Sequence, residues 1–231
     1  ILLAEDYIKK WITTELLIKK AVENLTVSQR DVSKELEEYK NSLITYRYKK
    51  ELMAEKMDTL VTTAEISDFY KANENNFILA NDIIKAIFMR IPLEDPLRLK
   101  ALEICKKTKG EELAEIQEFC LRHAESYNLY VNNWVDARIV LQNMPEMSTD
   151  PAGYFARGRA IEKTDEKYYY LVYVLSFRLK GSIAPLDYVS VNIRDLIINS
   201  RKTEFLKKLE EDIYTEGVRN QKFKIYNYET E

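Results

Sequence analysis

The chain has 231 residues, of which 46% are hydrophobic and 32% are charged, and this composition excludes a disordered or fibrous polypeptide. Its 35 basic and 38 acidic residues give a net charge of −3, so the bulk charge does not indicate a nucleic-acid binder. The chain has only five glycines and five prolines. We therefore expect long helices and do not expect phosphate-binding loops.

Several features bear on the compartment. The longest strongly apolar stretch without a charge, Tyr168 to Phe177, is too short to span a bilayer. No signal peptide is visible, and a chain that opens with Ile1 instead of Met is expected to be processed or trimmed. Cys105 and Cys120 are too few for a disulfide scaffold and lack the spacing of metal ligands.

The first 75 or so residues predict helices. Apolar residues from Tyr7 to Leu25 keep to one broad face, as in a packed amphipathic helix. Ser28 and Asp31 have the spacing of a capping box and predict the start of a second helix. Its apolar residues recur in steps of four and three and form one stripe: Val32, Leu36, Tyr39, Leu43, Tyr46, Met53 and Met57.

A third, short helix is predicted to begin at another capping box, Thr62 with Glu65, and to end in the polar run 73–76. An α+β unit of about ninety residues follows. Its expected elements are a buried strand over 83–91, helices over 96–108 and 111–125 separated by Gly110, a strand over 128–134, a helix over 135–144, and two strands around a turn at 163–167.

The tail returns to a helix. Pro185 is expected at its first position and Gly217 just past its end. Residues 222–228 then alternate polar and apolar side chains, which predicts a terminal strand. The predicted fold class is therefore α+β and helix-rich, with helices at both ends of a small antiparallel or mixed sheet.

Several local sequences occur in an order that suggests a family. They are the helix from Tyr7 to Leu25, the run 42–48 (SLITYRY), Val61-Thr62-Thr63-Ala64-Glu65-Ile66 with Tyr70 and Phe77, Ala184-Pro185-Leu186-Asp187-Tyr188-Val189, Ile193-Arg194 and Arg201-Lys202. In these stretches the chain resembles, over nearly its whole length, the SurA/PpiC group of bacterial periplasmic chaperones and parvulin-type prolyl isomerases.

The resemblance implies a helical chaperone module built from residues 1–80 and 181–231, with a parvulin-like domain over 81–180. It also implies unfolded envelope-protein clients, a periplasmic or cell-envelope location and no cofactor. The family module includes strands upstream of its first long helix, whereas this chain begins almost inside that helix. We therefore expect the terminal strand around Phe223 and Ile225 to be unpaired, or paired to a neighbouring molecule or to the final helix.

Two positions depart from the parvulin pattern. Phe88 stands where the family has a histidine in its first strand, and Tyr170 where it has one in its last strand. The family's glycine-rich segment is replaced by residues 129–134, which contain no glycine. A catalyst must favour the twisted amide over the planar one with placed polar groups, and Phe88 offers none. We therefore expect little or no isomerase activity and no catalytic residue.

Other candidate sites are weaker. The single histidine, His123, and the thiols of Cys105 and Cys120 are expected to pack inside the domain, although a disulfide is conceivable in an oxidising compartment. No metal site is expected. The stretch 153–160 superficially resembles a phosphate loop but lacks the Lys-Ser/Thr pair. A peptide-binding surface would use Tyr39, Tyr46 and Met53 on the helices, and Phe88, Trp134 and Tyr170 in the domain.

For Tyr39, Tyr46 and Met53, the alternative of an ordinary core-facing stripe is favoured residue by residue. Three functions remain. The leading hypothesis is an ATP-independent folding factor that holds extended client segments with its helical module. The second is a working prolyl isomerase with a pocket rebuilt around Tyr170 and Trp134. The third is an assembly subunit dedicated to one fixed partner.

Overall fold

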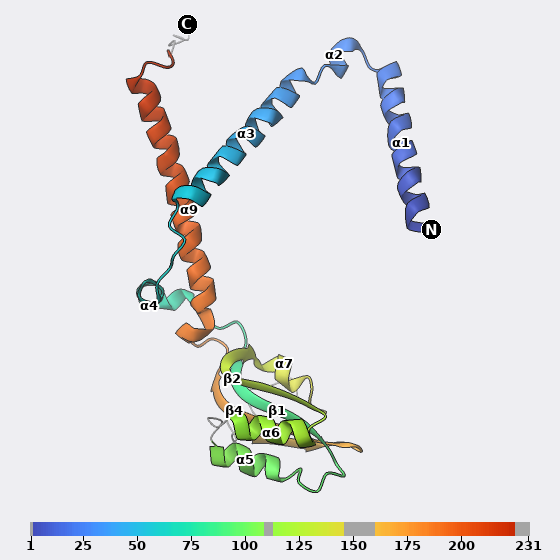
Figure 1. The fold of residues 1–231 in the computed structure, drawn as a ribbon, viewed down its shortest axis with the longest axis vertical. Helices are drawn as coiled ribbons and strands as arrows, with labels where there is room; N and C mark the ends of the chain where they lie inside the picture. The colour runs from blue at the N-terminus through green and yellow to red at the C-terminus, as the bar shows by residue number, and fades with distance from the viewer. Residues whose placement is uncertain (1, 109–112, 146–159, 225–231) are drawn as a thin grey trace. The chain divides into compact units, whose positions relative to one another are not determined.

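A computed structural model of the chain describes residues 2–108, 113–145 and 160–224 (Figure 1). It consists of long helices and one antiparallel sheet, so the predicted helix-rich α+β class is confirmed. The chain divides into two units. We refer to residues 1–58 with 201–231 as the helical unit and to residues 59–200 as the sheet unit. The functional division predicted at residues 80 and 180 stays a prediction.

The helical unit contains α1 (Leu2–Asn24), α2 (Val27–Arg30), α3 (Ser33–Lys56) and the second part of α9 (Leu186–Arg219). The capping box between α1 and α3 lies at Thr26 and Gln29, not at the predicted Ser28 and Asp31. Gln29 is long enough to accept the Thr26 backbone N–H at 3.0 Å. The shorter Asp31 instead accepts the Ser33 N–H, at 3.1 Å, where α3 begins.

Gly217 lies inside α9, so the prediction that it follows the helix end is wrong. The ring of Phe223 packs against this glycine, and a Cβ there would lie only 3.0 Å from the Phe223 Cε1. Phe223 also packs on Tyr214, with ring centroids 5.7 Å apart. Residues 222–224 are not in a strand, and the rest of the predicted terminal strand, including Ile225, is outside the described residues.

The sheet has the strand order β2-β1-β4-β3, and all its neighbours are antiparallel. Its strands are β1 (Ile83–Pro92), β2 (Ser126–Asp136), β3 (Ala160–Thr164) and β4 (Tyr168–Arg178). Each of the four lies where the sequence predicts a strand. β1 and β4 are central, which explains why both read as almost continuous apolar runs.

Helices cover both faces of the sheet: α5 (Lys100–Thr108) and α6 (Leu113–His123) lie on one, and α7 (Ala137–Leu141) on the other (Figure 1). Alternate strand residues supply the two cores. Phe88, Tyr170 and Val172 belong to the α7 cluster, whereas Met89 and Leu171 belong to the α5–α6 cluster.

The helix predicted over 96–108 begins only at Lys100, and the one predicted over 135–144 is the shorter α7. Asp136 explains the second difference, because its carboxylate accepts the Arg138 N–H and so caps α7 at the end of β2. Gly110 is outside the described residues.

The short helix η1 (Glu74–Asn76) follows α4 (Thr63–Ala72). A third cluster joins α4, Phe77 and Leu79 after η1, and the start of α9. The predicted capping box at Thr62 and Glu65 is confirmed. Ile66, Val189 and Ile193 are buried in this α4–α9 cluster, and the Tyr70 hydroxyl donates to the Ala184 carbonyl at 2.7 Å.

Asp187 fastens α9 to the sheet. Its carboxylate accepts the Trp134 indole N–H at 2.9 Å and the Lys85 ammonium at 2.7 Å, and that ammonium lies 5.1 Å from the Trp134 ring centroid. Burial opposes ionisation of Asp187, but the hydrogen bonds from Lys85 and Trp134 outweigh it and hold its pKa below 3.8.

Asp187→Asn is expected to lower the free energy of unfolding by about 1 kcal/mol at pH 7, a modest value because the carboxylate is half exposed. A depressed carboxyl pKa stabilises the fold above the unfolded pKa, and that stability is lost as the pH falls through the folded value. The difference between wild type and variant should therefore shrink below about pH 4, as measured by urea unfolding. Asp195→Asn, at an exposed position of α9, is the control. A pH-independent difference would contradict this account.

Candidate functional site

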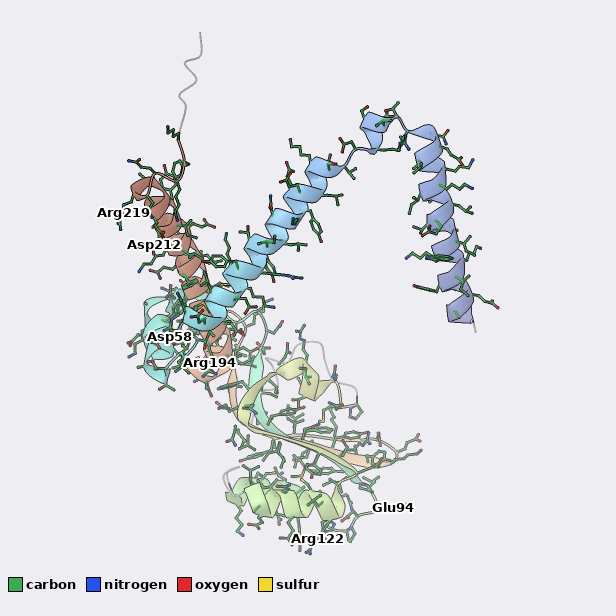
Figure 2. All side chains as sticks on the ribbon, turned by 45° about the horizontal axis from the view of Figure 1, so that its top comes forward. Asp58, Glu94, Arg122, Arg194, Asp212 and Arg219 are labelled. Atoms are coloured by element: carbon green, nitrogen blue, oxygen red, sulfur yellow. The ribbon has the colours of Figure 1, made fainter. Side chains whose placement is uncertain are left out.

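In the helical unit, α1 and most of α3 leave their apolar residues exposed. Every residue from Ala4 to Tyr48 is exposed, including Trp11 of α1. The expectation that these helices bury their apolar faces in a core is therefore wrong for this stretch. Figure 2 shows side chains standing out on all sides of α1 and α3.

Apolar residues form a stripe along each of these two helices. The α1 stripe is Ile8, Trp11, Ile18, Val22 and Leu25. The α3 stripe is the set predicted from the sequence: Val32, Leu36, Tyr39, Leu43, Tyr46, Met53 and Met57. Tyr39 and Tyr46 are each 63% exposed, whereas Met53 and Met57 are half-buried.

The α3 stripe is not the face that α3 turns towards α9. That face carries Tyr48 and Leu52, which line a depression of about 320 Å³ with Phe205 and Leu209. Tyr48 follows Tyr46 by two residues, which is about 200° around the helix. The part of the stripe from Val32 to Tyr46 therefore lies away from the packed face and is exposed, whereas Met53 and Met57, near the contact with α9, are half-buried.

Charged pairs close the contact between α3 and α9. Lys49 bonds Glu210, and the Arg201 guanidinium lies 3.6 Å from the Asp58 carboxylate. A second, larger depression of about 710 Å³ lies near the end of α9, between Tyr48, Ile213, Tyr214 and Phe223. This end of the helical unit therefore presents an aromatic-walled groove with charged residues at its rim.

The structure brings two of the predicted domain residues together. Phe88 and Tyr170 lie on the neighbouring strands β1 and β4 and share the α7 cluster, where they are 2% and 7% exposed. The Tyr170 hydroxyl donates to Asp165 at 2.7 Å. Neither side chain presents a free polar group to a bound peptide.

Trp134 is separate from that pair. It packs against the α4–α9 cluster and donates its indole N–H to Asp187. Its position is set by β2, where several residues bulge out opposite Lys85. A pocket that joins Trp134 to Tyr170 is therefore not apparent among the described residues.

Sequence reasoning missed a polar group at the other end of β1. The Arg90 guanidinium bonds Glu125 at 3.2 Å and lies 4.9 Å from the Tyr168 ring centroid. Tyr168, Glu125, Glu94 and Glu166 help to line a depression of about 480 Å³. No spacing in the sequence links these residues, because strand pairing brings them together. Its three carboxylates make this depression a poor site for an apolar peptide.

The Asp165 carboxylate stabilises the turn before β4. It accepts the Tyr170 hydroxyl and the backbone N–H groups of Lys167 and Tyr168, and these bonds hold its pKa below 3.8. Burial, and then the bond to Asp165, raises the pKa of Tyr170. The Tyr170 hydroxyl is therefore a structural donor at neutral pH.

His123 is partly buried, as expected, but it also has a polar partner. Its ring packs on Phe119 and its Nδ1 lies 2.8 Å from the Asp95 carboxylate. Among the residues that the structure describes, no group of three or more His, Cys, Asp or Glu side chains could hold a metal ion. Of the described helices, none is both long and apolar enough to cross a membrane.

Neither Cys105 nor Cys120 forms a disulfide, and both thiols are buried in the α5–α6 cluster. Burial raises the pKa of Cys105 and of Cys120 to about 12. We expect neither thiol to react with Ellman's reagent in the native protein at pH 8, and both to react once urea unfolds the chain. Rapid labelling of either thiol before unfolding would contradict the buried positions.

Comparisons with known proteins do not show a family for this chain. No model of a protein family matches the chain, and a search of curated proteins finds no match. A solved structure that matches comes from work on PEB4 and Cj1289, described as two SurA-like chaperones of Campylobacter jejuni. It shares 15% identity, with 97% of this chain and 85% of that chain covered, at a TM-score of 0.38. A TM-score this low supports no conclusion about shared fold or function.

Proposed function

We propose that the protein is an ATP-independent folding factor that holds unfolded or extended polypeptide segments on the exposed apolar surface of its helical unit. One observation carries the proposal: from Ala4 to Tyr48 no residue is buried, although the α1 and α3 stripes are apolar. Contiguous exposed apolar surface commonly marks an interaction site.

The chemistry of this surface fits clients of varied sequence. Tyrosine and methionine offer broad contact and adapt to different partners, and the α3 stripe contains both. Lys40, Lys50 and Glu51 lie among the apolar residues of α3 and keep the surface hydrated when it is empty. The sequence resemblance to SurA-like chaperones supports the same role and a periplasmic or envelope location.

The proposal assigns the sheet unit a scaffolding role without isomerase activity. Catalysis of rotation about an X–Pro bond needs polar groups placed at the amide. Phe88 has no polar group, and the Tyr170 hydroxyl already donates its hydrogen bond to Asp165. The remaining apolar face is closed by α7, with Val140 and Leu141 packed against Phe88 and Tyr170 in one cluster.

Removing apolar side chains from the α3 stripe should weaken client holding. We expect the double variant Leu36→Ser/Tyr46→Ser to need about tenfold more protein for half-suppression of the aggregation of several unrelated unfolded proteins. The matched control, Leu121→Ser/Tyr188→Ser, changes exposed residues of the same types in the sheet unit. Equal losses in both variants would contradict the placement of the surface, and suppression for a single client would favour the dedicated assembly subunit.

A proline-peptide assay tests the scaffolding role. The uncatalysed X–Pro bond isomerises over tens to hundreds of seconds, and we expect this rate to be unchanged by catalytic amounts of the protein. An active prolyl isomerase in the same assay is the control. Clear acceleration would overturn the inactive-domain proposal and favour a rebuilt pocket.

A further inference from the structure

The two edges of the sheet differ in how they are protected. The order β2-β1-β4-β3 places β2 and β3 at the edges, each paired on one side only among the described strands. β3 has five residues, including Glu162 and Lys163, and a short, charged strand is a usual protection of a sheet edge. β2 has eleven residues and carries no charge and no proline before Asp136. By this comparison β2 is the unprotected edge.

Two hydrogen bonds beside β1 show which way its backbone groups point. The Leu93 N–H donates to the Lys167 carbonyl on the β4 side at 2.8 Å, whereas the Arg90 carbonyl accepts the Glu125 N–H on the β2 side at 2.9 Å. Successive residues of a strand point their backbone groups to opposite neighbours. Odd-numbered residues in this part of β1 therefore face β4, and even-numbered residues such as Phe88 face β2.

The same alternation gives the open edge of β2. Asn128 lies opposite Phe88, so its backbone groups point to β1, as do those of Tyr130 two residues later. The backbone groups of Tyr127 and Leu129 point the other way, out of the sheet. Among the described residues, none hydrogen-bonds the Tyr127 or Leu129 backbone from that side. A row of unpaired N–H and C=O groups is a template for a further strand.

The side chains along this edge suit an apolar segment. Tyr127, Leu129 and Val131 are half-buried against the α5–α6 cluster, and Tyr130 against the α7 cluster on the opposite face. A strand added beside β2 places its alternate side chains next to them, where aromatic and β-branched residues pair best. The irregularity of β2 opposite Lys85 ends the regular stretch and limits pairing to about five residues.

We propose that the open edge of β2 binds an extended polypeptide segment with alternating apolar residues by strand addition, through the backbone groups of Tyr127 and Leu129. The edge selects an extended backbone, because the N–H and C=O groups of such a backbone repeat at the same two-residue spacing. The site lies at the edge of the sheet and not on its helix-covered faces, so it adds to the scaffolding role of the sheet unit. The proposal does not depend on client holding by the helical unit.

Amide exchange at single residues, followed by NMR in the full chain, tests the edge. The probe is a peptide of alternating threonine and valine with a lysine at each end. In the free protein, the Tyr127 and Leu129 amides should exchange at least tenfold faster than those of Asn128 and Tyr130, which bond β1. Added peptide should slow the first pair about tenfold and leave the second pair unchanged, whatever happens in α1 and α3.

Three results of this experiment would overturn the proposal. Tyr127 and Leu129 amides that are already slow in the free protein would mean that the chain itself or a second copy covers the edge. Equal slowing of odd-numbered and even-numbered residues of β2 would indicate general stabilisation and not strand addition. No slowing at the highest soluble peptide concentration would mean that the edge binds no such segment.

Two matched comparisons separate backbone pairing from side-chain contact. A peptide N-methylated on its central amides keeps its side chains but loses its donors, and it should bind at least tenfold more weakly. Leu129→Pro removes the outward N–H at a position where an edge strand tolerates proline, and Leu129→Ala, which keeps that N–H, is its control. Leu129→Pro should bind the unmethylated peptide about tenfold more weakly than Leu129→Ala, with urea unfolding used to check that both fold. Equal binding of the two peptides by the wild type would overturn the proposal even if Leu129→Pro does not fold.

Discussion

Pairing between β1 and β4 is the interaction on which the sheet unit depends. The two strands pair from Ile83 with Arg178 to Pro92 with Tyr168, and their alternate side chains enter cores on both faces of the sheet. A polar side chain in place of Phe88 would be buried under α7, and one in place of Leu171 would be buried under α5 and α6, so either substitution would destabilise the sheet unit. Because these faces are occupied by the protein's own α5, α6 and α7, the sheet has little apolar surface left for a ligand.

In the helical unit, by contrast, much of the apolar surface is not covered by other parts of the chain. Helices of 23 and 24 residues are only marginally stable alone in water, and most helices gain stability by burying an apolar face. Here α9 packs on one side of the end of α3, while every residue from Ala4 to Tyr48 is exposed. Binding of unfolded clients is one way in which these helices could bury their apolar faces.

Much of the fold could be predicted from local sequence. The capping box at Thr62, the apolar run of β1 and the turn before β4 each act within a few residues, so their signals are complete in the sequence. Gly217 misled the prediction, because its role is set by Phe223 and not by a helix end. For the candidate site, periodicity identified the α3 stripe but could not show whether another helix covers it, since a buried stripe and a binding surface have the same pattern. The bonds of Asp187 to Trp134 and of Arg90 to Glu125 join distant segments and had no sequence signal.

Hydrogen–deuterium exchange, with and without a permanently unfolded protein, tests the central claim most directly. In the free protein, the amides of α1 and of the part of α3 before Tyr48 should exchange much faster than those of β1 and β4, because no residue from Ala4 to Tyr48 is buried. Added unfolded protein should slow exchange in α3 and leave β1 and β4 unchanged. Protection of α1 and of the part of α3 before Tyr48 in the free protein, or slowing confined to the sheet unit, would contradict the account.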